Sequence, residues 1–102
     1  MKQRTLDELA ALAREGRGAA LDELCRRVRD DVYGLAMRML GHPADAEDAT
    51  QEILVKVATR LSAFRSESAF RTWVWTIATR HLARFRVGRR ESFVDFSLVE
   101  EM

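Results

Sequence analysis

The chain has 102 residues, of which 47% are hydrophobic and 32% are charged, and its formal net charge is +1. This length suits one domain, and the hydrophobic content is enough for a packed core. A single cysteine, Cys25, excludes an internal disulfide and a cysteine-based zinc site, and we expect it to pack as a small apolar side chain. No apolar run reaches the ~18 residues of a membrane span, so we expect a soluble, cytosolic, helical protein without a membrane partner.

The low net charge hides an uneven distribution along the chain. Residues 61–90 contain seven arginines against one glutamate, a net charge of +6, whereas residues 91–102 contain four acidic residues and no base. Arginine suits contacts with phosphates and stacking on bases, which makes the basic block a candidate nucleic-acid surface. A solvated arginine face is the alternative. The acidic end is either a linker or an electrostatic shield for the basic block.

The first half of the chain predicts two helices. Thr5 and Glu8 form a capping-box pattern, which predicts a helix that starts directly after Thr5 and ends near Gly16. A second helix is predicted over about 19–40, where apolar residues recur at three- and four-residue steps, until Gly41, His42 and Pro43 end it. The apolar stripe of this helix consists of Leu21, Leu24, Cys25, Val28, Val32, Leu35, Ala36 and Met39.

The second half predicts two more helices, so the expected fold is all-α, a compact bundle of about four helices. The third helix is predicted to start at an Asp45 N-cap, and residues 62–68 break its pattern. Its buried stripe is Ala46, Ala49, Ile53, Val57 and Leu61, and a different face carries Asp48, Gln51, Glu52, Val55 and Thr59. Ser68 is the expected cap of a fourth helix over about 69–87, which Gly88 should end. Its inner face is predicted to be Phe70, Val74, Ile77, Ala78, His81 and Phe85.

Catalysis has little support in this sequence. His42 and His81 lie far apart and neither belongs to a Ser/His/Asp or Cys/His pattern, so we expect His42 in a loop and His81 packed. The acidic residues around Asp45 could ligate a metal, but their place at a helix N-terminus explains them without one. No glycine-rich phosphate loop is present. We therefore expect no enzyme, no cofactor and no metal site.

The segment 64–90 places aromatic rings among its arginines. Exposed rings offer faces to unstacked bases, and each such stack contributes ~1–3 kcal/mol. Trp73 and Trp75 lie ~200° apart on a helix, so at least one of them should lie at an edge or be exposed. This pattern favours single-stranded or opened nucleic acid over an intact duplex. Two core aromatics in a small bundle are the alternative.

Two motifs in this order resemble region 2 of the bacterial sigma-70 family of transcription factors, in its extracytoplasmic-function (ECF) group. They are DAEDATQEILVKV at residues 45–57 and FRSESAFRTWVWTIA at residues 64–78. The family patterns are an acidic DAEDLVQE helix, then FRGESSFRTWLYRIA, then a basic helix end. The resemblance covers about residues 20–90.

This resemblance implies a role in transcription initiation. The third helix would bind the clamp helices of the largest catalytic subunit of core RNA polymerase through Asp48, Gln51, Glu52 and Val55. The loop and the fourth helix would melt the promoter −10 element and hold its non-template strand as single-stranded DNA, with one base turned out of the stack. The implied DNA-contacting residues are Phe64, Arg65, Ser66, Ser68, Trp73, Trp75, Arg80 and Arg84.

The chain also departs from the family pattern. Arg80 stands where family members commonly carry asparagine, so a −10 base preference cannot be carried over. Arg84 replaces a commonly acidic or amide residue and strengthens the basic stripe. Ser66 stands where the family usually has glycine, which should make the loop backbone less permissive.

The expected organisation is a region 2 domain over residues 1–90, followed by the acidic start of an interdomain linker at residues 91–102. The C-terminal domain that binds the −35 element in such factors is expected to be absent from this chain. The alternative is a protein-interaction or regulatory helical module. Such a module would be held by an anti-sigma factor, or would have diverged and lost promoter recognition.

Overall fold

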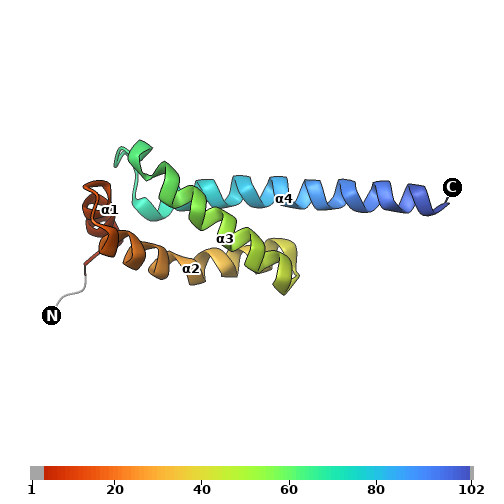
Figure 1. Cartoon of the computed structure of the whole chain (residues 1–102), viewed down its shortest axis with the longest axis horizontal. Helices are drawn as coiled ribbons and strands as arrows, with labels where there is room; N and C mark the ends of the chain where they lie inside the picture. Colours follow the sequence, from red (N-terminus) through yellow and green to blue (C-terminus); the bar gives the residue numbers. More distant parts are fainter. Residues whose placement is uncertain (1–3, 102) are drawn as a thin grey trace.

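The computed structural model describes residues 4–101, and it describes side chains over residues 4–85. Within this part the chain forms helices and no strand, which confirms the predicted all-α fold (Figure 1). In chain order the elements are α1 (Leu6–Arg14), α2 (Gly18–Leu40), α3 (Pro43–Arg60), the short 3-10 helix η1 (Leu61–Ala63) and α4 (Phe70–Glu101).

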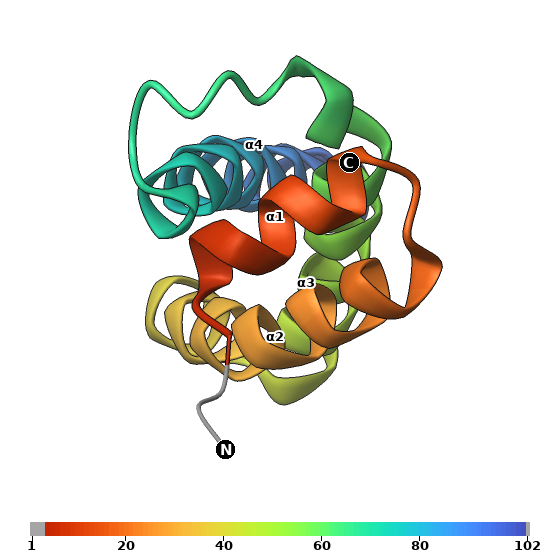
Figure 2. The same ribbon diagram turned by 90° about the vertical axis from the view of Figure 1, so that its left-hand side faces the viewer.

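Helix α1 begins with the predicted capping box. The Thr5 hydroxyl accepts from the Glu8 backbone N–H at 3.1 Å, and the Glu8 carboxylate accepts from the Thr5 N–H at 3.4 Å. The chain turns away from α1 at Gly16, whose φ of +92° favours glycine. Helix α1 buries Leu9 and Ala10 and lies across one end of the bundle, against α2, α4 and η1 (Figure 2).

Helix α2 buries the centre of its predicted stripe against α3. Leu24, Val28, Val32 and Ala36 are buried, while the other predicted members lie half-buried at the edges of the stripe. The helix ends at Gly41 in the left-handed conformation (φ +67°), and the Gly41 N–H donates to the Met37 carbonyl at 2.8 Å. This αL ending is one that helices commonly use before a proline.

Helix α3 has its N-cap three residues earlier than predicted, so the prediction of an Asp45 N-cap is wrong. Pro43 occupies the first turn, where its fixed φ favours helix formation, and His42 is the N-cap residue. Asp45 instead lies within the first turn, where a carboxylate still interacts favourably with the helix dipole. The predicted stripe from Ala46 to Leu61 is buried throughout. Thr50 is also buried, and its hydroxyl donates to the Ala46 carbonyl at 2.7 Å.

Helix α4 differs from its prediction at both ends. Ser68 is not its cap, because an N-cap hydroxyl accepts from a backbone N–H, whereas the Ser68 hydroxyl donates to the Ala69 carbonyl at 3.3 Å. That carbonyl also accepts from the Trp73 N–H at 3.2 Å. Gly88 does not end the helix, which continues to Glu101. A glycine inside a helix costs ~1 kcal/mol relative to alanine, and the arginines that follow it favour helix. The domain boundary expected at residue 90 falls inside this helix and stays a prediction.

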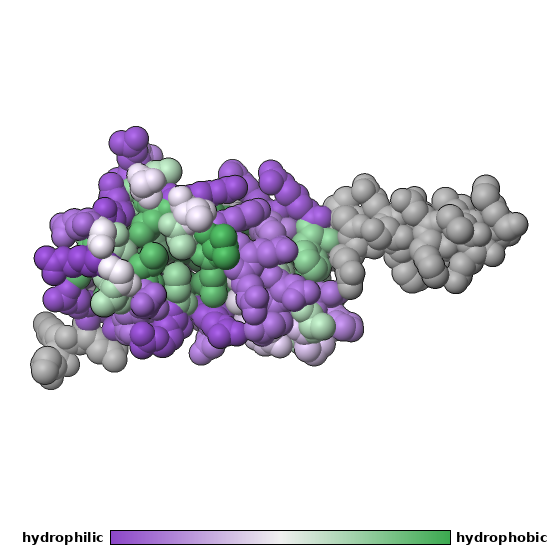
Figure 3. Space-filling view, in the orientation of Figure 1, coloured by the Kyte–Doolittle hydropathy of each residue, from purple (hydrophilic) through white to green (hydrophobic). Residues whose placement is uncertain are grey.

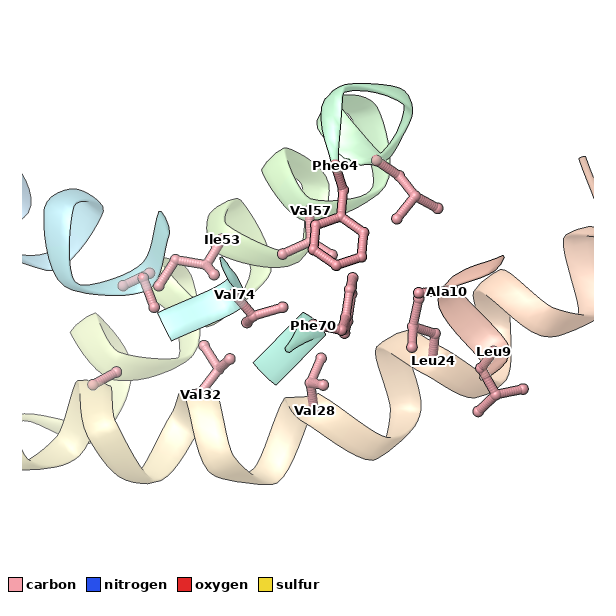
Figure 4. Close-up of a cluster of buried hydrophobic side chains, with 14 of the residues drawn as sticks. Leu9, Ala10, Leu24, Val28, Val32, Ile53, Val57, Phe64, Phe70 and Val74 are labelled. Carbon is pink, nitrogen blue, oxygen red and sulfur yellow. The ribbon is translucent and has the colours of Figure 1, made fainter. Parts of the chain in front are cut away.

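The core is centred on Phe70, whose side chain is fully buried (Figure 4). Side chains from all four helices and from the segment after η1 surround it. Burying a phenylalanine contributes ~1.5–3 kcal/mol. The predicted inner face of α4 is confirmed for Phe70, Val74 and Ala78, while Leu82, which was not predicted, is fully buried beside them.

Candidate functional site

One face of α3 presents four exposed side chains opposite the buried stripe. We call it the α3 face; it consists of Asp48, Gln51, Glu52 and Val55. The spacing i, i+3, i+4 and i+7 brings these residues together on one side of a helix. Val55 is 61% exposed, and among residues 4–85 no other large hydrophobic side chain is exposed. In the space-filling view an apolar area lies over α3 and the adjacent part of α2, bordered by hydrophilic surface (Figure 3).

His81 of α4 lies at the edge of the α3 face. Its Nδ1 is 2.8 Å from Lys56 Nζ, and its Nε2 is 2.8 Å from Glu52 Oε2. The side chain is 13% exposed, in agreement with the predicted packed histidine. A hollow of about 400 Å³ opens here, lined by Gln51, Glu52, Val55, Lys56 and His81.

A second candidate surface is the loop of residues 64–69, which connects η1 to α4. Arg65, Ser66 and Ser68 are all exposed on it. Ser66 has a φ of 59°, and it is the one non-glycine residue with positive φ in the described chain. A side chain rarely adopts this left-handed conformation, which glycine adopts readily, so the departure from the family glycine falls at a position where the backbone favours glycine. The Arg14 guanidinium of α1 donates to the Ser66 hydroxyl at 3.4 Å.

Phe64 does not take the exposed position that a DNA-stacking residue needs. Its ring is 3% exposed and packs edge-on against the Phe70 ring, with the two ring centroids 5.5 Å apart. The centroid of the Trp73 ring is 5.2 Å from that of Phe64. Aromatic pairs in this geometry contribute about 0.5–1.5 kcal/mol beyond the burial of their area. The buried ring therefore anchors the 64–69 loop to the core, and the role of Phe64 as a DNA contact stays a prediction.

The loop is also fixed by a residue that the sequence analysis did not identify. Asp7 of α1 accepts a hydrogen bond from the Phe70 backbone N–H at 2.8 Å, through its Oδ1. The carboxylate therefore caps the N-terminus of α4, where the helix dipole favours a negative charge. The two residues are 63 positions apart in the chain, and no local pattern relates them.

The two tryptophans lie on opposite sides of α4. Both are half-buried, which confirms that at least one lies at an edge of the core. Trp73 packs on the loop side, with its ring centroid 5.6 Å from that of Phe70. Trp75 instead lines a groove of about 670 Å³ between α2 and α4. The groove is lined by Asp30, Asp31, Gly34, Arg38, Arg71, Thr72, Trp75, Thr76 and Thr79.

Exposed arginines continue the loop surface along α4. Arg80 and Arg84 are exposed, and their spacing of seven and eleven residues from Trp73 places them on the same flank of the helix. Within residues 4–85 neither these arginines nor Arg65 forms an ion pair. Arg71 differs, because it pairs with Asp31 of α2. Together with the loop, this flank of α4 therefore carries a net positive charge, since these three arginines face one acidic residue of the loop, Glu67.

Other kinds of site have no counterpart in the described part of the chain. No three histidine, cysteine or acidic side chains come together there as a metal site. None of its helices is both long enough and apolar enough to cross a membrane. Burial, with a smaller effect from Asp22, raises the pKa of the Cys25 thiol, which keeps the thiol protonated and unreactive at neutral pH.

The sequence matches the family described as Sigma-70 region 2 over residues 24–92. Two similar proteins are the RNA polymerase sigma-H factor of Pseudomonas aeruginosa and the ECF RNA polymerase sigma-E factor of Escherichia coli strain K12. The first is 30% identical over 82 residues, which cover 80% of this chain and 42% of the relative. The second is 31% identical over 101 residues, which cover 97% of this chain and 52% of the relative. The chain thus spans about half the length of these relatives.

A solved structure has the same fold. It is an NMR structure of an engineered region 2 of sigmaE in complex with GTAAAA, with a TM-score of 0.79 and 28% sequence identity. The similarity covers 88% of this chain and 96% of the other. Because the family match covers most of the chain and includes both candidate surfaces, this protein belongs to the Sigma-70 region 2 family, in its ECF group.

Proposed function

We propose that this chain acts as the region 2 domain of an ECF sigma factor. It binds core RNA polymerase through the α3 face, and it recognises and melts the promoter −10 element by holding the non-template single strand. The observation that carries this proposal is the similarity to a sigmaE region 2 solved with GTAAAA. The role involves no catalytic step and places the protein in the cytoplasm, where the polymerase works.

The composition of the α3 face supports a protein partner. Its two carboxylates, Asp48 and Glu52, lie on the same face as the exposed Val55, and protein interfaces combine apolar and polar side chains. The clamp helices of the largest polymerase subunit are the proposed partner. An anti-sigma factor would compete for the domain if it covered the same face.

The DNA contacts are proposed along one flank of α4 and the 64–69 loop. This surface, which we call the DNA stripe, consists of Arg65, Ser66, Ser68, Trp73, Arg80 and Arg84. Its arginines neutralise backbone phosphates, and the exposed part of Trp73 offers an edge to an unstacked base. The Phe64 ring is buried in the core next to the loop and is not part of the stripe. Trp75 lies on the opposite flank, outside it.

The polymerase contact is tested by binding of the purified chain to a recombinant clamp-helix fragment. We expect Glu52→Lys to weaken binding at least tenfold, which corresponds to about 1.4 kcal/mol, with unchanged helicity by circular dichroism. Glu15→Lys, an exposed acid beyond the end of α1, is the matched control and should bind like the wild type. Equal binding by both variants would overturn the polymerase assignment.

The DNA contact is tested with two fluorescent single strands, GTAAAA and a random-sequence pool of equal length. Binding should weaken with salt with a log–log slope of about −0.7 per phosphate neutralised. Replacing both Arg80 and Arg84 by alanine should make this slope about 1.4 units shallower if each arginine neutralises one phosphate. Binding that does not respond to salt would contradict the DNA stripe.

The alternative of a pure protein-interaction module has one observation in its favour. Phe64 is buried and Trp73 is half-buried, so fewer ring faces are available to bases than the sequence predicts. A module of this kind would bind the clamp fragment or an anti-sigma factor and would not bind either single strand. The salt titration therefore separates the two functions.

A further inference from the structure

The contacts of His81 define which of its nitrogens carries the proton. A lysine ammonium can only donate, so Nδ1, 2.8 Å from Lys56 Nζ, must accept. The ring proton is then on Nε2, from which it is donated to Glu52 Oε2 at 2.8 Å. Lys56 thus selects one neutral tautomer of His81, and that tautomer donates to the carboxylate on the α3 face.

We propose that His81 is a positioning residue, which fixes the Glu52 carboxylate in the orientation that binds the polymerase. This inference rests on the proposed polymerase binding and extends it from α3 to a residue of α4. The Glu52 side chain is 57% exposed, and an exposed glutamate ordinarily samples many rotamers. A bond from the nearly buried His81 restricts these rotamers before the partner arrives, which lowers the entropy lost on binding.

The arrangement also indicates the chemistry of the group that Glu52 meets. His81 is neutral in this tautomer, so it orients the Glu52 carboxylate without neutralising its charge. The second carboxylate oxygen, Oε1, accepts no hydrogen bond from any side chain within residues 4–85. The adjoining hollow, with Val55 and Gln51 in its lining, has room for a side chain of the partner. The occupant that fits is an arginine or lysine of the clamp helices.

A purely structural role for His81, as a spacer between α3 and α4, makes a different prediction. Any side chain that fills the same space would then preserve polymerase binding, and loss of the ring nitrogens would not weaken it. His81→Leu keeps an apolar side chain in this space and removes both nitrogens. His81→Gln keeps an N–H that can donate to Glu52, so the two variants separate the spacer role from the positioning role.

The experiment measures binding of the full chain to the clamp-helix fragment for His81→Leu, His81→Gln and Glu52→Gln, and for the double variant of His81→Leu with Glu52→Gln. We expect His81→Leu to weaken binding about 3- to 10-fold and His81→Gln to restore it to within about twofold of the wild type. The double variant should bind no more weakly than Glu52→Gln alone, because His81 acts through Glu52. Ring-nitrogen NMR of the wild type should show Nε2 as the protonated nitrogen.

Wild-type binding by His81→Leu, or a fully additive effect in the double variant, would overturn the positioning role and leave the polymerase surface intact. Unchanged binding by Glu52→Lys would overturn the polymerase surface and this inference together. If His81→Leu does not fold, His81→Met provides the same test, since it also fills the space without ring nitrogens. It should then weaken binding in the wild-type background and have no further effect in Glu52→Gln, and any other pattern would contradict the inference.

Discussion

The α3 face and the 64–69 loop present their exposed side chains in different ways. The α3 face lies on a regular helix, whose own hydrogen bonds hold the backbone of every residue in place. The loop has no such repeat. It is fixed by Phe64 in the core, by the Asp7 carboxylate on the Phe70 N–H, and by the contact between Arg14 and Ser66.

This difference suits two different tasks. A rigid helical face is appropriate for docking on a partner of fixed shape, because little is reordered on binding. A loop that receives an unstacked base needs a shape that a helix cannot supply, and here distant residues of α1 support it. Changes that weaken those supports should therefore affect DNA binding and leave the α3 face intact.

The largest expected effect is the loss of the loop anchor. Phe64→Ala should lower the free energy of unfolding by about 3–5 kcal/mol, as is usual when a buried phenylalanine is truncated. Urea denaturation monitored by circular dichroism measures this value. Arg65→Ala, at the exposed neighbouring position, should change stability by less than about 0.5 kcal/mol. A similar small change in both variants would show that Phe64 does not anchor the loop.

A smaller effect is expected from the cap that α1 provides. Asp7→Ala should lower the free energy of unfolding by about 1 kcal/mol and weaken single-strand binding, because the start of α4 and the loop lose their support. Asp7→Asn keeps a side-chain acceptor and should lie between the alanine variant and the wild type. If the main effect of Asp7 were to repel the DNA phosphates, Asp7→Ala would bind the strand more tightly, and fluorescence anisotropy distinguishes these outcomes.

The helical and non-helical regions also differed in how far they could be predicted. The positions of Asp48, Gln51, Glu52 and Val55 follow from helical periodicity, because burial of one side of α3 fixes the opposite side as exposed. For Ser66, the glycine of the family pattern indicated a less permissive loop backbone, and the positive φ itself was not predicted. Helical periodicity therefore contained the information for the α3 face.

The remaining features depend on tertiary contacts. The burial of Phe64 results from packing against Phe70 and Trp73 and cannot be derived from its place in an irregular segment. Ser68 has the residue type of an N-cap, yet the Asp7 carboxylate from a distant helix takes that role. The separation of Trp73 from Trp75 was predicted by angle, but which of them faces the loop depends on how α4 packs.

A modest gain in stability is expected at the loop itself. Ser66→Gly should raise the free energy of unfolding by up to about 1 kcal/mol, because glycine adopts the left-handed conformation without the strain of a side chain. Ser66→Ala keeps the strain and loses the contact with Arg14, so it should be slightly less stable than the wild type. Thermal unfolding of the three proteins tests this order, and a destabilised glycine variant would contradict it.

The smallest effect is expected at Cys25 on α2, outside both regions. Its pKa is raised by burial and by Asp22, so the folded state holds the thiol proton to a higher pH than the unfolded state does. The resulting stabilisation is complete below the ordinary thiol pKa and is lost as the pH rises through the folded-state pKa. Under reducing conditions, the wild type should lose more stability than Cys25→Ala between neutral and alkaline pH. Parallel pH profiles would contradict the raised pKa.

The most direct test of the two-surface account is one NMR experiment on the 15N-labelled chain, titrated separately with the clamp-helix fragment and with the GTAAAA single strand. We expect the clamp fragment to shift amide signals of the α3 face and of His81, and the strand to shift those of the 64–69 loop, Arg80 and Arg84. Strand-induced shifts centred on residues 48–55, or clamp-induced shifts centred on the loop, would contradict the assignment of one surface to each partner.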